Sequence, residues 1–269
     1  MDKTKIDWCD STWNPVTGCF HSCEYCYARR IAKRFGGAGE THCNETVGTE
    51  CQWETSAEGK IHVLSEPIYD YDHGRNAPYP YEFDPTFHKY RLNEYQNKKG
   101  RNIFVCSMAD LFGDWVPDEW IEEVFKACHD ATQHNYLFLT KNPERYAELG
   151  MPCDNYLWYG TSVCKKSDIP KCKYLPLGSK KFVSIEPILE DLKIIDSPLI
   201  NYVDWVIIGA ETGRRKNKVI PERKWIEDIV NECKENGTAV FMKSSLSDIW
   251  GEPLIQEFPA ELKRKGDKS

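Results

Sequence analysis

Residues 13–35 of the chain read WNPVTGCFHSCEYCYARRIAKRF, and they divide into an expected strand, a cysteine-rich loop and an expected helix. Trp13–Thr17 suits a short strand, Gly18–Cys26 suits a loop, and Tyr27–Phe35 suits a helix rich in Arg and Lys. A strand that leads through a loop into a helix is the repeating unit of a parallel α/β sheet.

From residue 100 onward the same alternation continues. Short apolar runs, apolar on both faces as buried parallel strands are, occur at Ile103–Cys106, Tyr136–Leu139, Leu157–Tyr159, Lys181–Ile185, Trp205–Ile208 and Ala239–Met242. Between them lie two stripes with helical spacing: Trp120, Ile121, Val124, Phe125 and Cys128, and then Trp225, Ile226, Ile229, Val230 and Cys233. The pattern predicts an α/β fold with a parallel sheet, open or closed into a barrel.

Two segments depart from this rhythm. Residues 36–85 contain glycines, acids, tyrosines and prolines, and we interpret them as an irregular insertion between the first helix and a helix near Phe87–Lys98. The tail after Glu252 is polar and is expected to fray. The organisation that we predict is one barrel domain over residues 1–269, with an insertion at 36–85 and a polar tail at 253–269.

Composition narrows the functional classes. The chain has 269 residues, of which 41% are hydrophobic, and its net charge is −7. It has no run of about eighteen apolar residues that would cross a membrane, and the first residues have no apolar signal region, so we expect a cytoplasmic protein. The negative charge argues against a broad non-specific DNA-binding surface but leaves a local basic groove open. The twelve cysteines suggest free thiols and metal ligation rather than disulfides.

Polar side chains follow nearly every apolar run, at the point where each expected strand ends. They are Ser107 and Asp110, Thr140 and Lys141, Thr161 and Ser162, Ser184 and Glu186, Glu211 and Thr212, and Lys243 and Ser244. Because the carboxyl ends of parallel strands form the active site in α/β barrels and open sheets, this repetition favours a shared pocket over ordinary loop polarity.

The cysteine loop carries the most specific chemical signal. Cys19, Cys23 and Cys26 have the spacing C-x3-C-x2-C, which can give three irons of a cubane one thiolate each and leave the fourth iron open. An open coordination position is typical of catalytic metal sites. Two alternatives stay open: a zinc site completed by His21, Cys9 or Cys43, and chance spacing in a cysteine-rich chain.

This motif resembles that of the radical S-adenosylmethionine (SAM) superfamily. The resemblance implies a [4Fe–4S] cluster on Cys19, Cys23 and Cys26, whose open iron chelates the amine and carboxylate of SAM. It also implies reductive cleavage of SAM to methionine and a 5′-deoxyadenosyl radical. Tyr25, the aromatic residue before the third cysteine, would lie against the adenine. The implied fold is a partial (β/α) TIM-type barrel.

A closer resemblance covers most of the chain. Asp7-Trp8 and Thr12–Cys19 look like the opening of a phage and bacterial radical SAM-like family of unknown function with a three-cysteine motif. Further resembling segments are Ser107–Gly113, Leu139–Lys141, Val183–Pro187 and Ile208–Gly213. The family implies no substrate.

Cys23–Tyr27 is also similar to the corresponding segment of the spore photoproduct lyases, radical SAM enzymes that repair a thymine dimer. That resemblance implies contacts with SAM from Asp110, Lys141 and Ser162. The lyases also have a thiol near the end of their second strand, and the position that matches it here is Ser107, next to Cys106. Lys141 can pair with the SAM carboxylate, Asp110 with its ammonium, and Ser162 with ribose or carboxylate. Without the motif, Lys141 would be a surface lysine. Glu186 and Glu211 could contact SAM, the substrate or a neighbouring loop.

The function that we predict is therefore a radical SAM enzyme, with a nucleic acid base or nucleotide favoured over a peptide as substrate. It would need an electron donor such as flavodoxin or ferredoxin. The alternative is a non-enzymatic Fe–S or zinc protein that binds a partner. The basic residues Arg29, Arg30, Lys33 and Arg34 could be solvated, or could meet a phosphate backbone or a reductase's acidic surface. Cys43 and Cys51 could ligate a second metal, whereas Cys128 and Cys233 are expected in the core.

Overall fold

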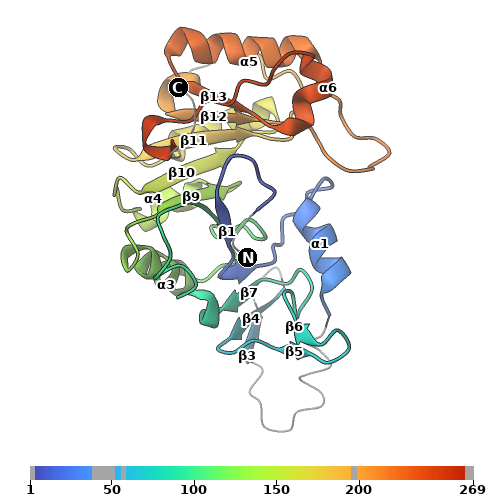
Figure 1. Ribbon diagram of the computed structural model, residues 1–269, viewed down its shortest axis with the longest axis vertical. Helices are drawn as coiled ribbons and strands as arrows, with labels where there is room; N and C mark the ends of the chain where they lie inside the picture. The colour runs from blue at the N-terminus through green and yellow to red at the C-terminus, as the bar shows by residue number, and fades with distance from the viewer. Residues whose placement is uncertain (1–3, 38–51, 56–58, 195–198, 264–269) are drawn as a thin grey trace. The chain divides into compact units, whose positions relative to one another are not determined.

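The computed structural model describes residues 4–37, 52–55, 59–194 and 199–263 (Figure 1). The strands are β1 (Ser11–Trp13), β2 (Val16–Thr17), β3 (Gln52–Thr55), β4 (Lys60–Leu64), β5 (Tyr69–Asp70), β6 (Arg75–Asn76), β7 (Thr86–His88), β8 (Asn102–Val105), β9 (Asn135–Thr140), β10 (Leu157–Ser162), β11 (Lys180–Ile185), β12 (Trp205–Ile208) and β13 (Ala239–Met242). The α-helices are α1 (Tyr27–Phe35), α3 (Asp118–His129), α4 (Glu144–Leu149), α5 (Arg223–Asn236) and α6 (Ser247–Trp250). Short 3-10 helices include η1 (Lys89–Arg91) and η2 (Lys166–Tyr174).

The largest sheet has seven strands in the order β1-β8-β9-β10-β11-β12-β13. Neighbouring strands from β9 to β13 pair in parallel. The register aligns Thr161 of β10 with Val183 of β11, and Ser162 with Ser184, so the carboxyl ends of these strands lie along one edge. This confirms the predicted α/β class with a parallel sheet. Among the described residues, β1 and β13 end the strand order, so the sheet is open.

The predicted apolar runs are confirmed as strands, because they are buried on both faces. The strands Trp205–Ile208 and Ala239–Met242 and the helix Tyr27–Phe35 have the bounds that the sequence predicts. The first helical stripe is buried throughout, and the second is buried except for the partly exposed Trp225. Gly237 ends α5 in the left-handed conformation that an Asn-Gly stop signal favours. Cys128 and Cys233 are fully buried in these helices, as expected.

The chain forms two compact units. Unit 1 comprises residues 1–11, 101–103 and 135–269, and unit 2 comprises residues 12–100 and 104–134. The expectation of a single barrel domain stays a prediction. Across the part of the chain that the structure describes, no helix has the length and apolar character needed to span a bilayer.

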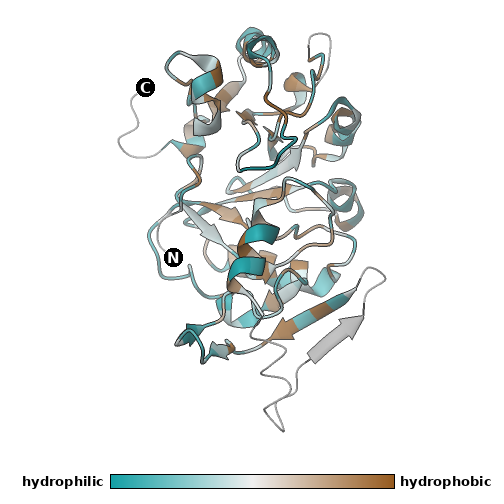
Figure 2. Ribbon diagram, turned by 90° about the vertical axis from the view of Figure 1, so that its right-hand side faces the viewer, coloured by the Kyte–Doolittle hydropathy of each residue, from teal (hydrophilic) through white to brown (hydrophobic). Residues whose placement is uncertain are grey.

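Unit 1 is built around the parallel strands β9–β13. Trp205 is fully buried, and its ring centroid lies 6.1 Å from those of Trp8 and Phe241 and 5.5 Å from that of Phe258. Helix α5 lies alongside β13 and buries Ile226, among other apolar residues (Figure 1). Figure 2 shows hydrophobic colour on many strand segments and hydrophilic colour on much of the helical ribbon. Burial of apolar strands under amphipathic helices stabilises this unit.

Unit 2 contains a second sheet, of strand order β2-β7-β4-β3. Its β7 strand pairs with both β2 and β4 and is buried throughout. Phe87 of β7 stacks on Trp120 of α3 with ring centroids 5.2 Å apart. This sheet therefore packs on the apolar face of α3 and ends, at Thr17 of β2, where the cysteine loop begins.

Three local expectations were wrong. Trp13–Thr17 is not one strand, because Asn14-Pro15 separates β1 from β2 and the two strands belong to different sheets. The described part of segment 36–85 holds β3 to β6, which is more regular structure than we expected. Residues 87–98 form the end of β7, η1 and turns instead of a helix, because Phe87 and His88 are drawn into the second sheet.

The tail after Glu252 does not fray within its described part. The indole Nε1 of Trp205 donates to the carbonyl of Glu257 at 2.9 Å, and the amide of Met242 donates to the carbonyl of Ile255 at 2.7 Å. Leu262 is 1% exposed. The polar composition of the tail did not predict this docking, because only a few of its side chains are buried.

We predict that Leu262→Ala destabilises the protein by about 2–5 kcal/mol, because it removes a buried leucine and leaves a cavity. The free energy of unfolding from urea titration measures this. The neighbouring Lys263→Ala is the matched control, since Lys263 is exposed and should change little. Equal stability of the two variants would mean that the tail is not docked.

Candidate functional site

The cysteine loop is anchored where it leaves β2. Gly18 has φ +85°, and its amide donates to the carbonyl of Met108 at 2.9 Å. A Cβ at this position would lie 2.2 Å from the carbonyl oxygen of Asp84, so only glycine permits this approach. The next amide, that of Cys19, donates to the carbonyl of Phe83 at 3.1 Å. These contacts determine where the first cysteine begins the loop.

The three motif cysteines lie on this one loop, and none of them is in a disulfide. Cys19 is buried, whereas Cys23 and Cys26 are partly exposed. Cys26 is the N-cap of α1, and its Sγ accepts from the amide of Arg29 at 3.4 Å. The Sγ of Cys19 accepts from the amide of His21 at 3.3 Å. A helix N-terminus and amide donors stabilise a thiolate, the form that binds metal.

The pKa of the Cys19 thiol depends on burial and on the other two cysteines of the loop. Burial raises the pKa of the Cys19 thiol well above its usual range, and Asp110, Cys23 and Cys26 raise it further. The thiol is therefore neutral in the free chain and has to lose its proton when it binds metal. A cation lies close by, because the Arg29 guanidinium donates to the carbonyls of Cys19 at 3.1 Å and of His21 at 2.8 Å.

The donor types of the cysteine loop can be compared with those that a metal group requires. Within the described ranges, no three His, Cys, Asp or Glu side chains converge as the ligands of a single metal ion do. In a cubane each thiolate binds a different iron, so its ligands do not have to converge on one point. The loop supplies three thiols outside any disulfide, which is the donor type that a cubane takes.

The candidate fourth ligands of a zinc site have other contacts. The Nε2 of His21 lies 3.0 Å from Oδ2 of Asp110. The thiol of Cys9 is buried and donates to the carbonyl of Ile6 at 4.0 Å. Cys43 lies outside the described residues, and so does Cys51, the other cysteine proposed for a second metal.

Asp110 and Ser107 lie on the loop after β8 in unit 2, beside the cysteine loop. Asp110 is buried, and its Oδ1 accepts from the amide of Phe112 at 3.1 Å while Oδ2 meets His21. The Ser107 hydroxyl lies 3.2 Å from Oδ1 of Asn14, and its carbonyl accepts from the Tyr27 hydroxyl at 2.7 Å. Tyr25 is half-buried on the cysteine loop itself. The structure thus gathers the unit 2 candidates around one loop.

The remaining predicted residues follow strands of unit 1. Lys141 follows β9, and its ammonium donates to the Sγ of Cys164 at 3.7 Å. Ser162 ends β10 and is partly exposed. Glu186 follows β11, and its carboxylate forms a close ion pair with Lys243, which follows β13. The thiol of Cys164 donates to the carbonyl of Glu186 at 3.2 Å, so Lys141, Cys164, Glu186 and Lys243 form one connected polar cluster.

Glu211 contacts the loop that follows β12. It is buried and holds Arg215 through two bonds of 2.8 Å, as a bidentate ion pair. Its carboxylate therefore organises the loop after β12.

The sequence analysis missed two residues that contact the candidate site residues, Cys164 in unit 1 and Asn14 in unit 2. Cys164 comes two positions after the end of β10, and its place at a strand end was a signal that we did not use. Asn14 has no sequence signal of its own, because its contacts with Ser107 and with the amide of Met108 join positions more than ninety residues apart.

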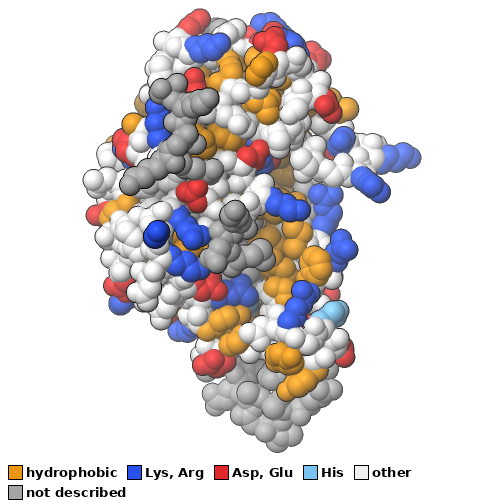
Figure 3. All heavy atoms as spheres, in the orientation of Figure 1, with side chains coloured by type: hydrophobic (Ala, Val, Ile, Leu, Met, Phe, Trp, Pro, Cys, Tyr) orange, Lys and Arg blue, Asp and Glu red, His pale blue; other side chains and the backbone are white. Residues whose placement is uncertain are grey.

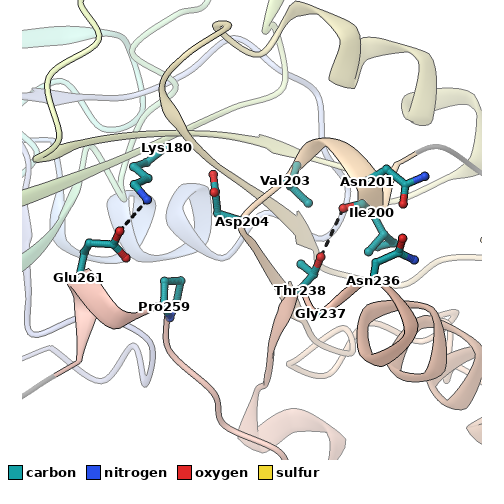
Figure 4. Close-up of a pocket in the computed structure, with 10 residues that line it drawn as sticks. All are labelled: Lys180, Ile200, Asn201, Val203, Asp204, Asn236, Gly237, Thr238, Pro259 and Glu261. Atoms are coloured by element: carbon teal, nitrogen blue, oxygen red, sulfur yellow. Dashed lines mark hydrogen bonds and ion pairs between the residues drawn. The ribbon is translucent and has the colours of Figure 1, made fainter.

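A pocket of about 500 Å³ lies elsewhere in unit 1 (Figure 4). It is lined at one end by Lys180 and Glu261, which form an ion pair of 2.6 Å, and at the other by Thr238 and Ile200. Lys180 begins β11, and Thr238 precedes β13. The pocket is therefore at the amino ends of these strands, the edge opposite the candidate residues, and we do not assign the chemistry to it.

We predict that Gly18→Ala destabilises the protein by more than the roughly 1–3 kcal/mol of backbone strain alone, because its Cβ would also clash with the carbonyl of Asp84. Gly150→Ala is the matched control, since Gly150 has φ +65° and open space around the position of a Cβ. Urea unfolding of both variants measures the difference. A Gly18 variant no less stable than the Gly150 variant would contradict the anchored loop.

Comparison with known proteins assigns the chain to a family without assigning a function. No curated protein matches. Among solved structures, spore photoproduct lyase complexed with dinucleoside spore photoproduct is similar at 11% identity and a TM-score of 0.39, over 82% of this chain and 85% of that chain. A likeness of this strength supports no functional conclusion. The model of a family described as a protein of unknown function (DUF5131) matches residues 3–267, and the chain therefore belongs to that family.

Proposed function

We propose that this protein is a radical SAM enzyme that holds a [4Fe–4S] cluster on Cys19, Cys23 and Cys26. The observation that carries the proposal is the anchored loop with its three cysteine thiols outside any disulfide, one of them at the N-terminus of α1. Three thiolates leave one iron of a cubane without a protein ligand, and an open position suits catalysis. When bound, the cluster supplies the electron that splits SAM into methionine and a 5′-deoxyadenosyl radical.

In unit 2, we assign SAM-binding roles to Asp110, Tyr25 and Ser107. Asp110 pairs with the SAM ammonium, which its buried carboxylate suits because a charged partner offsets the cost of burial. His21, at 3.0 Å, positions that carboxylate. Tyr25 lies against the adenine, and Ser107, held by Asn14, offers a hydroxyl to SAM.

In unit 1, Lys141 and Ser162 take the carboxylate and ribose of SAM, and Glu186 contacts SAM or substrate. Their positions directly after β9, β10 and β11 support this, because strand carboxyl ends carry the functional groups of α/β barrels. The open parallel sheet is accordingly proposed to be the partial (β/α) barrel of radical SAM enzymes. The ion pair between Lys243 and Glu186 restrains the glutamate side chain.

We propose a nucleic acid base or nucleotide as the substrate, ahead of a peptide. Its support is the loop after β12, which carries exposed Arg214, Lys216 and Lys218. None of the three has a side-chain ion pair within the part of the chain described, so the loop presents unneutralised positive charge to a phosphate. The similarity of Cys23–Tyr27 to the spore photoproduct lyases favours the same class.

The decisive experiment is anaerobic reconstitution with iron and sulfide, followed by reduction with dithionite in the presence of SAM. We predict about four irons per chain and formation of 5′-deoxyadenosine and methionine. Replacing Cys19, Cys23 or Cys26 by Ala should abolish both. Cys153→Ala is the matched control, because Cys153 is a free, exposed cysteine outside the loop.

Three outcomes would contradict the proposed function or its assigned cluster ligands. Zinc without iron or sulfide in anaerobically purified protein would identify a zinc protein. A four-iron protein that binds no SAM and forms no 5′-deoxyadenosine would identify a non-enzymatic Fe–S protein. Iron content unchanged in all three cysteine variants would place the metal on other residues.

We predict that Lys141→Ala weakens SAM binding by about 1.5–3 kcal/mol while the iron content is kept, because a charge-assisted contact with the carboxylate is lost. Equilibrium binding of SAM to the reconstituted protein measures this. Lys234→Ala is the control, since Lys234 is an exposed lysine on α5. Equal affinities of the two variants for SAM would remove Lys141 from the site.

A further inference from the structure

Helix α1 has an unusual distribution of side chains. Its large apolar residues Tyr27, Ile31 and Phe35 are four positions apart, so they form one stripe along the helix. All three are exposed, at 42%, 37% and 40% of their surface. The buried residues are only Ala28 and Ala32. An amphipathic helix ordinarily turns its large apolar side chains inward, and α1 presents them outward.

Cations surround this stripe. Arg30, Lys33 and Arg34 are exposed on α1, and the helix contains no acidic residue. The guanidinium groups of Arg34 and Arg75 lie 5.2 Å and 5.7 Å from the ring centroid of Phe35. Within the described ranges, no carboxylate pairs with these four cations. Figure 3 shows hydrophobic and basic side chains gathered over α1.

The same helix is attached directly to the cysteine loop. It begins after its N-cap Cys26, and Arg29 in its first turn donates to two carbonyls of that loop. Tyr27, the first residue of the stripe, bonds the carbonyl of Ser107 beside the same loop. A partner bound along α1 would therefore lie next to the proposed cluster ligands of unit 2.

We propose that the α1 face, made of Tyr27, Ile31 and Phe35 with Arg30, Lys33 and Arg34, docks an acidic one-electron donor protein. This inference rests on the proposed function, because reductive cleavage of SAM requires an external electron. The donor's reduced cofactor loses one electron and is oxidised, and the cluster gains that electron and is reduced. No bond between the two proteins forms or breaks.

The chemistry of the face favours a protein over a nucleic acid. Interfaces between proteins place aromatic and aliphatic residues at the centre and charges at the rim. Phosphate backbones need the cations but gain nothing from an exposed isoleucine between them. The unpaired positive rim attracts an acidic partner over a distance and accelerates encounter, whereas the apolar stripe supplies the area that becomes buried.

Binding of a bacterial flavodoxin and of a [2Fe–2S] ferredoxin to the reconstituted full chain tests this inference. We expect at least one of them to bind, with affinity that falls as salt rises, because the rim charges are exposed. Ile31→Asp and the double variant Lys33→Glu/Arg34→Glu should each weaken that binding by about ten-fold or more. Both should keep the iron content and the dithionite-driven cleavage of SAM, since neither touches the loop.

The double variant Lys216→Glu/Lys218→Glu is the matched control. It makes the same change of charge on the exposed loop of unit 1, and it should leave donor affinity unchanged while lowering affinity for a single-stranded oligonucleotide. The α1 variants should show the opposite pattern.

The outcomes separate this inference from the proposed function. Absence of SAM cleavage with dithionite would overturn the proposed function and the inference with it. Cleavage with dithionite, together with no binding of either donor or with donor affinity unchanged in both α1 variants, would overturn the docking face alone. Oligonucleotide affinity lost in the α1 variants, or a dimer of the chain dissociated by Ile31→Asp, would assign the face to another occupant.

Discussion

The cysteine loop depends on one close backbone contact, between Gly18 and the chain at Asp84. Only a residue without a Cβ can take φ +85° there and still approach the carbonyl of Asp84. Because the amide of Gly18 also bonds Met108, this single position joins three segments of unit 2. The contact holds the start of the loop, at Cys19, next to the segment that carries Asp110.

Polar groups in the two units are held in different ways. Around the cysteine loop, backbone groups form many of the hydrogen bonds to the side chains. Amides donate to the sulfur of Cys19 and to Asp110, and carbonyls accept from Arg29. At the strand ends of unit 1, side chains hold one another, as Lys243 holds Glu186 and Arg215 holds Glu211. Backbone contacts of this kind suit a rigid ligand such as the proposed cluster, whereas side-chain pairs can exchange partners when a charged molecule binds.

Helix α1 exposes its large apolar side chains and buries only small ones. Its register leaves two small alanines facing the protein, so its large side chains remain outside. A core-facing helix gains stability by burying such residues, and an exposed apolar stripe with unpaired cations forgoes that gain. Such a face is more readily explained by binding than by folding, and its attachment to Cys26 ties that binding to the proposed chemistry.

The sequence by itself determined the α/β class, most strands, the helices α1, α3 and α5, and the three-thiol loop, because hydrophobic period and cysteine spacing are local signals. It did not determine that Asn14-Pro15 divides two sheets, that residues 87–98 avoid a helix, or that the tail docks through Leu262. Those outcomes depend on burial against distant strands, which overrides local propensity. The pairing of Lys141 with Cys164 and of Glu186 with Lys243 likewise arose only when parallel strands brought their carboxyl ends to one edge.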